Sequence, residues 1–319
     1  MDSRIHSVVA LQAAVPSDAI GAALAAAMRE DERVILLGEA VGRQGGALGA
    51  SRGLLASFGP QRVIDTPIAE DGLLGLAFGM ALGGRRPVVE LVGPSARLWA
   101  QLSREIASVA ERSGAEFSAP VLVRVPYGPL PGQERAYDDE PSARLTLAAL
   151  ATIPGLTVLC ASTPGDAAAM LRWALAAGGP VVLLEPRALF GAVDPGLTEL
   201  PLPRARVLQA GSGLTLAAWG AGVEAARAAM AALGDEASPE LIDLRALNPL
   251  DSATLADSVR RTGRLLVVDD LFGAEASPAA LRALSSASEA AFLHLEAPPR
   301  VVPAEPGRIA REALASLRF

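Results

Sequence analysis

Residues 62–91 read RVIDTPIAEDGLLGLAFGMALGGRRPVVEL. Two short apolar runs flank a glycine-rich and almost uncharged segment, and Gly and Pro lie at the borders. This pattern predicts buried parallel strands joined by a helix that covers the sheet. Glu70 stands out at the start of the uncharged segment, because a carboxylate among apolar groups is costly unless something pairs with it.

Glu70 has two interpretations at this point. The carboxylate could cap a helix that begins around Asp71, because free amide groups and the helix dipole favour an acidic residue at that place. It could instead bind a partner group outside the chain. The residues next to Glu70 do not distinguish a helix cap from a binding group, so the choice depends on sequence blocks elsewhere in the chain.

Composition indicates a folded protein with a large core. The chain has 319 residues, of which 51% are hydrophobic, and this length suggests two domains. No run of about 18 residues is both strongly apolar and uncharged, so we expect no membrane span. The first residues, MDSRIHS, lack the apolar core of a signal peptide, and we expect a cytoplasmic protein.

Charge and rare residues exclude several function classes. The net charge is -7 and the arginines are scattered, which argues against nucleic-acid binding. The single Cys160 excludes an internal disulfide and is expected to be a buried strand thiol. Only His6 and His294 occur, so this chain alone offers no histidine metal site or catalytic triad. We expect His294 to be a structural residue in a strand.

Alternating apolar runs and amphipathic segments predict an α/β fold with mostly parallel sheets. We expect a first domain at residues 1–186, a linker at 187–205 and a smaller domain at 206–319. The expected strands are 34–37, 63–64, 87–91, 121–125, 157–160, 181–184, 214–219, 240–243, 265–269 and 291–295. The expected helices are 17–29, 73–82, 98–113, 165–177, 223–233, 253–261 and 277–285.

Several sequence blocks follow one another in the order of a known family. They are DTPIAEDG at residues 65–72, GLAFGMALGGRRPVVE at 75–90, VILLGEAVGRQGGALGASRGL at 34–54, IPGLTVLCASTPGDA at 153–167 and LIDLRALNPLD at 241–251. Together they resemble the beta subunit of the decarboxylating component of 2-oxo acid dehydrogenase complexes. This subunit belongs to the transketolase-like thiamine diphosphate enzymes, so the resemblance implies a pyrimidine-binding α/β domain followed by a transketolase C-terminal-type domain.

The resemblance implies that thiamine diphosphate is the cofactor. Glu70 would then bind ring N1' of the aminopyrimidine and push it toward its imino form, and Ile68 and Ala69 would shape the neighbouring wall. Removing this carboxylate should abolish turnover. Glu39 matches a second family carboxylate on a proton path, although a polar residue at a strand end is an equal alternative.

The part of the family pattern that binds the diphosphate is missing. The family holds it through Mg²⁺ on a GDG motif followed by an Asn, and no GDG occurs here. Gly165 and Asp166 come closest, but their surroundings, PGDAAA, indicate a helix start. The diphosphate and Mg²⁺ are therefore expected on an alpha subunit, in an α2β2 heterotetramer.

The sequence departs from the family around one pocket. The family histidine that helps acyl transfer to a lipoyl arm is absent, and its place falls at Tyr137 or Ser142. Tyr137 or the nearby Asp138 could take over proton transfer, or this stretch could be a solvated acidic loop. Trp99 could partly replace an aromatic ring that faces the pyrimidine. A potassium-binding Asp of some relatives has no clear match.

Two functions remain open from the sequence. The first is a beta-type subunit that, with an alpha subunit, cleaves or decarboxylates a 2-oxo acid or ketose to an activated aldehyde. The acceptor would be a lipoyl carrier protein or a second carbonyl, as in a carboligase. The second is a non-catalytic scaffold subunit that keeps the fold and the partner surface. Retention of Glu70 and its whole block favours the first.

Overall fold

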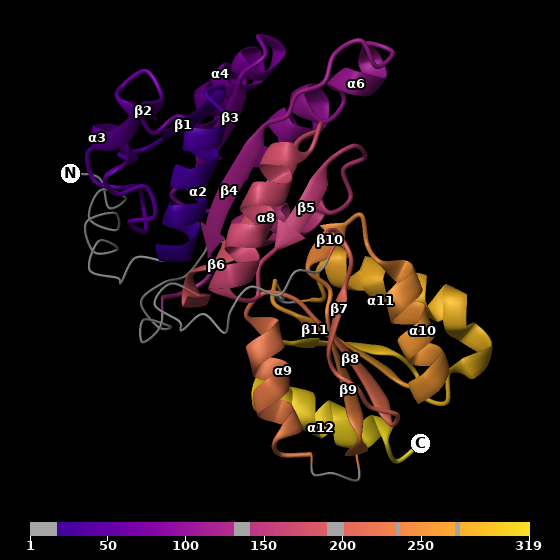
Figure 1. Cartoon of the computed structure of the whole chain (residues 1–319). Helices are drawn as coiled ribbons and strands as arrows, with labels where there is room; N and C mark the ends of the chain where they lie inside the picture. The colour runs from indigo at the N-terminus through magenta and orange to yellow at the C-terminus, as the bar shows by residue number, and fades with distance from the viewer. Residues whose placement is uncertain (1–17, 131–140, 190–200, 234–236, 272–274) are drawn as a thin grey trace. The chain divides into compact units, whose positions relative to one another are not determined.

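The computed structural model describes residues 18–130, 141–189, 201–233, 237–271 and 275–319 (Figure 1). The chain divides into two compact units. The first contains residues 1–146 and 153–199, and the second contains residues 147–152 and 200–319. Each unit holds a mostly parallel sheet with flanking helices, which confirms the expected α/β class.

The first unit is built on parallel strands in the order β5-β6-β4-β3-β1-β2. Every residue of β1, β4 and β6 is buried, as expected where helices cover both faces of a parallel sheet. The strands are β1 (Val34–Gly38), β2 (Val63–Asp65), β3 (Arg86–Glu90), β4 (Leu122–Tyr127), β5 (Thr157–Cys160) and β6 (Val181–Pro186).

Helices α2 and α8 pack against each other, and α4 packs on β1 and β3 (Figure 1). Helix α8 begins as the PGDAAA stretch predicts, because the Thr163 side chain accepts a hydrogen bond of 3.0 Å from the Asp166 amide. The bounds are α2 (Asp18–Glu30), α3 (Leu54–Phe58), α4 (Glu70–Leu82), α5 (Leu98–Gln101), a π-helix (Leu102–Ile106), α6 (Val109–Arg112), α7 (Pro141–Leu150), α8 (Pro164–Ala176) and a 3-10 turn (Arg187–Leu189).

The second unit has the strand order β12-β11-β8-β9-β7, in which only β7 runs antiparallel to its neighbour. Its strands are β7 (Arg206–Gln209), β8 (Leu214–Ala218), β9 (Pro239–Asp243), β10 (Ala246–Asn248), β11 (Leu265–Asp269) and β12 (Arg300–Pro303). Its helices are α9 (Gly222–Met230), α10 (Ser252–Thr262), α11 (Pro278–Ala291), a 3-10 turn (Phe292–His294) and α12 (Pro306–Ser316).

Two sequence-based expectations were wrong. The expected helix 98–113 is interrupted by the π-helix, where the Ala107 amide donates to the Leu102 carbonyl at 2.8 Å. Leu98, Leu102 and Ile106, which lie four residues apart, are all buried. The expected strand 291–295 is instead the end of α11 and a 3-10 turn, because alanines at helical spacing carry the helix to residue 291.

The helices within the described ranges are all too short or too polar to cross a membrane.

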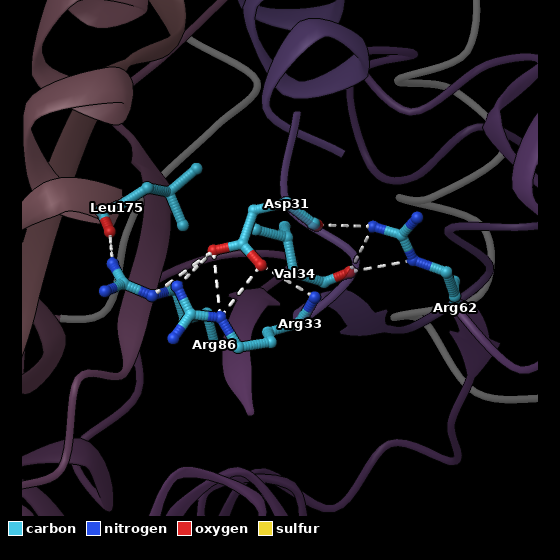
Figure 2. Close-up of polar contacts among 6 residues, drawn as sticks. All are labelled: Asp31, Arg33, Val34, Arg62, Arg86 and Leu175. Carbon is cyan, nitrogen blue, oxygen red and sulfur yellow. Dashed lines mark hydrogen bonds and ion pairs between the residues drawn. The ribbon is translucent and has the colours of Figure 1, made fainter. Parts of the chain in front are cut away.

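The amino ends of the first strands are joined by a polar network around Asp31 (Figure 2). The Asp31 carboxylate accepts hydrogen bonds from Arg33 Nε at 2.9 Å and Arg33 Nη2 at 2.8 Å. Arg86 Nε lies 3.5 Å from the same carboxylate, and Arg86 Nη1 donates to the Leu175 carbonyl on α8. Asp31 therefore links the start of β3 to the end of α2.

Arg62 completes this network from the start of β2. Its Nη2 donates to the Asp31 and Val34 carbonyls, each at 2.9 Å (Figure 2). The hydrogen bonds from Arg33 lower the pKa of Asp31 to about 2, although slight burial opposes this shift.

We expect Asp31→Asn to lower the free energy of unfolding at neutral pH by no more than about 1 kcal/mol, because the charged pair is partly exposed. The folded-state pKa lies below the unfolded value, so the contribution is complete above about pH 4 and is lost as the pH falls toward 2. Urea unfolding of both proteins at pH 7 and pH 3 would measure this. A difference that grows at pH 3 would contradict it.

Candidate functional site

The candidate site lies at the carboxyl edge of the first sheet. The chain leaves β1 for β2 on one side and then crosses to β3 on the other side, so β1 is a topological switch point. Ligands of open α/β sheets bind outside the carboxyl ends of strands at such a point. Gly38 is in register with Asp65 and Glu90, which places the carboxyl ends of three strands at one level.

Glu70 is the first residue of α4 and is half-buried. The cap position belongs to Ala69, so Glu70 does not cap the helix through its side chain. Its carboxylate lies in the first turn, where the helix dipole favours negative charge. Within the described residues this carboxylate has no hydrogen bond or ion pair. It therefore keeps its acceptor capacity for another molecule.

The surface around Glu70 is apolar and exposed. Ile68 is 44% exposed and Ala69 is exposed, so both can form the wall that the sequence suggested. Helix α4 is apolar on all sides after Asp71. One side packs into the core through Leu73, Leu74, Ala77 and Ala81, whereas the other side, which we call the open α4 face, is exposed at Gly72, Gly75, Leu76, Gly79 and Leu82.

Trp99 lies on α5, which packs against α4. Its side chain is 44% exposed. Arg97 just before α5 lies 3.2 Å from the Asp71 carboxylate at the start of α4. This exposed ion pair ties the two helices together next to Glu70.

Glu39 follows β1 directly and is half-buried. The loop after it is fixed by Asp65, whose carboxylate accepts from the Gly42 amide at 2.6 Å and from Arg43 Nε at 2.9 Å. Burial would raise the pKa of Asp65, but these hydrogen bonds outweigh it and lower the pKa. Asp65 is therefore a structural carboxylate at neutral pH.

Sequence reasoning missed a buried charge cluster beside this loop. Arg124 on β4 donates from Nε and Nη2 to the Glu185 carboxylate on β6 at 2.8 and 2.9 Å. Its Nη1 donates to Glu90 Oε2 at 2.5 Å. All three side chains are at least 96% buried. The sequence does contain a sign of this cluster, because each of three apolar strand segments carries one charged residue. The segments are PVVEL at 87–91, LVRVP at 122–126 and VLLEP at 182–186.

The cluster holds two carboxylates and one guanidinium. Burial raises the pKa of Glu90, Arg124 opposes this shift, and Glu185 adds to it. The remaining Glu90 oxygen accepts a hydrogen bond of 3.1 Å from the Ala47 amide in the loop after β1. The cluster thus contacts the segment that begins at Glu39.

The structure describes only some of the other residues that the sequence analysis singled out. Tyr137 and Asp138 lie outside the described residues. Asp166 forms part of the start of α8 and accepts from the Ser162 and Thr163 hydroxyls, so it is a structural residue. Cys160 is a buried strand thiol, as expected, with its sulfur 3.3 Å from the Tyr127 hydroxyl oxygen.

Comparison with known proteins identifies both domains. Residues 13–192 match the family model "Transketolase, pyrimidine binding domain", and residues 204–317 match "Transketolase, C-terminal domain". A solved structure described as a split-gene transketolase, an inactive beta4 tetramer, has a TM-score of 0.71. It is 19% identical and covers 96% of this chain and 97% of its own, so it supports the fold alone.

Curated relatives are more similar in sequence. The pyruvate dehydrogenase E1 component subunit beta of Acholeplasma laidlawii is 35% identical over 88% of this chain and 86% of its own length. The protein of the same name from Leifsonia xyli subsp. xyli is 37% identical over 88% and 83%. The 3-methyl-2-oxobutanoate dehydrogenase subunit beta of Mycobacterium tuberculosis is 38% identical over 79% and 73%.

The order of the two domains, the fold and this level of identity agree, and the chain therefore belongs to the transketolase-like family, in the group of beta subunits of 2-oxo acid dehydrogenases.

Proposed function

We propose that this chain binds the pyrimidine half of thiamine diphosphate through Glu70, in a two-chain enzyme that decarboxylates a 2-oxo acid. The observation that carries the proposal is the Glu70 carboxylate. It is half-buried at the start of α4 and has no partner among the described residues, and an exposed apolar wall lies beside it. A flat heterocycle with a protonated ring nitrogen fits such a surface.

Bound thiamine diphosphate supplies a carbon nucleophile and holds the electrons released by decarboxylation. Glu70 would accept a hydrogen bond from ring N1' and hold the proton on that nitrogen. A water-poor site strengthens this charge-assisted bond, and Ile68 and Ala69 would exclude water from one side. Glu39, half-buried after the neighbouring strand, would serve proton transfer near the cofactor.

The GDG motif that would hold the diphosphate is absent from the sequence, and Asp166 is used in the start of α8. We therefore place the diphosphate and Mg²⁺ on an alpha subunit, in an α2β2 tetramer.

The open α4 face supports a partner chain. A helix that is apolar on all sides is normally buried, yet Leu76 on this helix is 45% exposed. Gly75 and Gly79 have no atom within 4 Å of a Cβ built on them, so a second helix could approach the backbone closely. Glu70 starts the same helix but lies on the side that carries Leu73, Leu74, Ala77 and Ala81. A chain that covers the open α4 face would therefore reach Glu70 only around the first turn of the helix.

The substrate class follows from the relatives, whose names identify pyruvate and 3-methyl-2-oxobutanoate dehydrogenases. We propose a 2-oxo acid as the first substrate. The acceptor of the activated aldehyde is a lipoyl carrier protein or a second carbonyl compound. Both should be tested, because the family histidine that helps transfer to a lipoyl arm is absent.

Glu70→Gln should abolish decarboxylation of pyruvate and 3-methyl-2-oxobutanoate by the complex with its alpha subunit, lowering kcat by about 100-fold or more, because the carboxylate at N1' is lost. Asp71→Asn is the matched control. It removes the neighbouring carboxylate and its contact with Arg97 but leaves Glu70 intact, so activity should remain near that of the wild type.

Dye reduction measures turnover, and calorimetric titration with thiamine diphosphate and Mg²⁺ measures binding. Assembly without cofactor binding in the wild type would reject the proposal in favour of a scaffold subunit. Equal losses in the two variants would reject the role of Glu70.

Gly79→Leu should block assembly with the alpha subunit, because a large side chain would fill the open α4 face. The single chain should stay folded, since the site has open space and leucine favours a helix more than glycine does. Gly307→Leu on α12 is the control, as that position is also open. Size-exclusion chromatography with light scattering reports the assembly, and normal tetramer formation by Gly79→Leu would refute the interface.

A further inference from the structure

Residues 45–51, which we call the β1 loop, are completely buried although they form no helix or strand. Glu90 reaches into the loop, where its Oε1 accepts the hydrogen bond from the Ala47 amide at 3.1 Å. A Cβ built on Gly46 would lie 1.8 Å from that oxygen, so the loop backbone and the carboxylate are in direct contact. The fit depends on glycine at this position.

The β1 loop is in turn bonded to the residue after Glu39. The Gly46 and Gln44 amides both donate to the Ala40 carbonyl, at 3.1 and 3.0 Å. Ala40 has a φ of 54°, a left-handed conformation that is uncommon for alanine. Such strain persists only where the surroundings hold it, and the Gln44 and Gly46 amides are among the groups that do so.

Glu90 itself cannot move freely. Its Oε2 accepts from Arg124 Nη1 at 2.5 Å, and Arg124 is fixed by two hydrogen bonds to Glu185 on the next strand. The contacts therefore run in an unbroken order from Arg124 through Glu90 to Ala47 and Gly46, and from there to Ala40 beside Glu39.

We propose that Glu90 is a positioning residue: its carboxylate, oriented by Arg124, holds the β1 loop through the Ala47 amide and so fixes Glu39 for the reaction. The proposal rests on the function proposed above insofar as it concerns Glu39. The hold on the loop is a property of this chain alone and can be tested without activity.

The position requires a group with two acceptor oxygens. A carboxylate accepts from Ala47 and from Arg124 at the same time. A glutamine has one acceptor and one NH₂ donor group, and the charged Arg124 would take the carbonyl oxygen. The NH₂ group would then face the Ala47 amide, donor against donor. Glu90→Gln should thus release the loop while leaving the Arg124–Glu185 pair intact.

Hydrogen exchange followed by mass spectrometry tests the hold on the loop in the isolated chain. Peptides covering residues 40–53 should exchange roughly tenfold faster in Glu90→Gln than in the wild type. Glu185→Gln is the matched control, because it removes one buried carboxylate from the same arginine but does not touch the loop. Equal exchange in wild type and Glu90→Gln, or equal increases in the two variants, would overturn the proposal.

A second pair of variants tests the same contact from the loop side. Gly46→Ala should speed exchange of the β1 loop, since the new methyl group displaces the Glu90 oxygen. Gly53→Ala is the control for backbone strain alone, because Gly53 has a similar φ of 80° but open space around it. The same effect from both variants would show that Glu90 is not the cause.

A double-mutant cycle in the assembled enzyme tests the action through Glu39. Glu90→Gln should lower kcat by about tenfold in the wild-type background and have almost no further effect in the Glu39→Gln background. A merely structural role would give independent, additive losses. Additive losses, or a normal kcat for Glu39→Gln alone, would overturn the action through Glu39.

The experiments distinguish failure of the proposed function from failure of the hold of Glu90 on the β1 loop. If the wild-type complex neither binds thiamine diphosphate nor decarboxylates the two acids, the proposed function fails and the positioning of Glu39 fails with it. The exchange measurements still decide in that case whether Glu90 holds the loop.

Discussion

The structure at the carboxyl edge of the first sheet depends on Arg124, whose positive charge pairs with the buried carboxylates of Glu90 and Glu185. Three neighbouring strands each place one charged side chain in a region that is otherwise apolar. Deleting one member of such a cluster while its partner charge remains costs on the order of 3–5 kcal/mol in other proteins. The strands β3, β4 and β6 are thus constrained in register by charge as well as by backbone pairing, and the loop beside Glu39 takes its position from them.

On the proposed function, the single chain presents half of an active site. Its own core is complete around the parallel strands, yet Glu70 has no internal partner within the described residues and the helix that begins there keeps one apolar side exposed. The function proposed above would explain both features through a second chain that covers the helix and supplies the diphosphate site. The glycines on that side keep the backbone accessible, whereas the leucines provide apolar area.

Much of the fold could be predicted from the sequence because apolar runs bounded by Gly and Pro are strong signals. Strands 157–160 and 265–269 were predicted with the observed bounds. The π-helix at Leu102–Ile106 was missed, since its apolar spacing differs little from that of an ordinary helix. Strand β12 and helix α12 were missed, although α12 carries the buried residues Ile309, Ala313 and Ser316 at helical spacing. For the candidate site, the family pattern predicts Glu70 and Glu39, and both stay predictions. The Glu90–Arg124–Glu185 contacts depend on strand order, which local patterns do not reveal.

The exposed side of α4 has a consequence for how the protein must be produced in the cell. Molecules synthesised in excess of their partner would present a continuous apolar strip that encourages self-association and aggregation. Balanced synthesis of the two chains, or capture of each new beta chain soon after it leaves the ribosome, would keep this strip covered. On the proposed interface, the solubility of the chain would therefore depend on the supply of its partner.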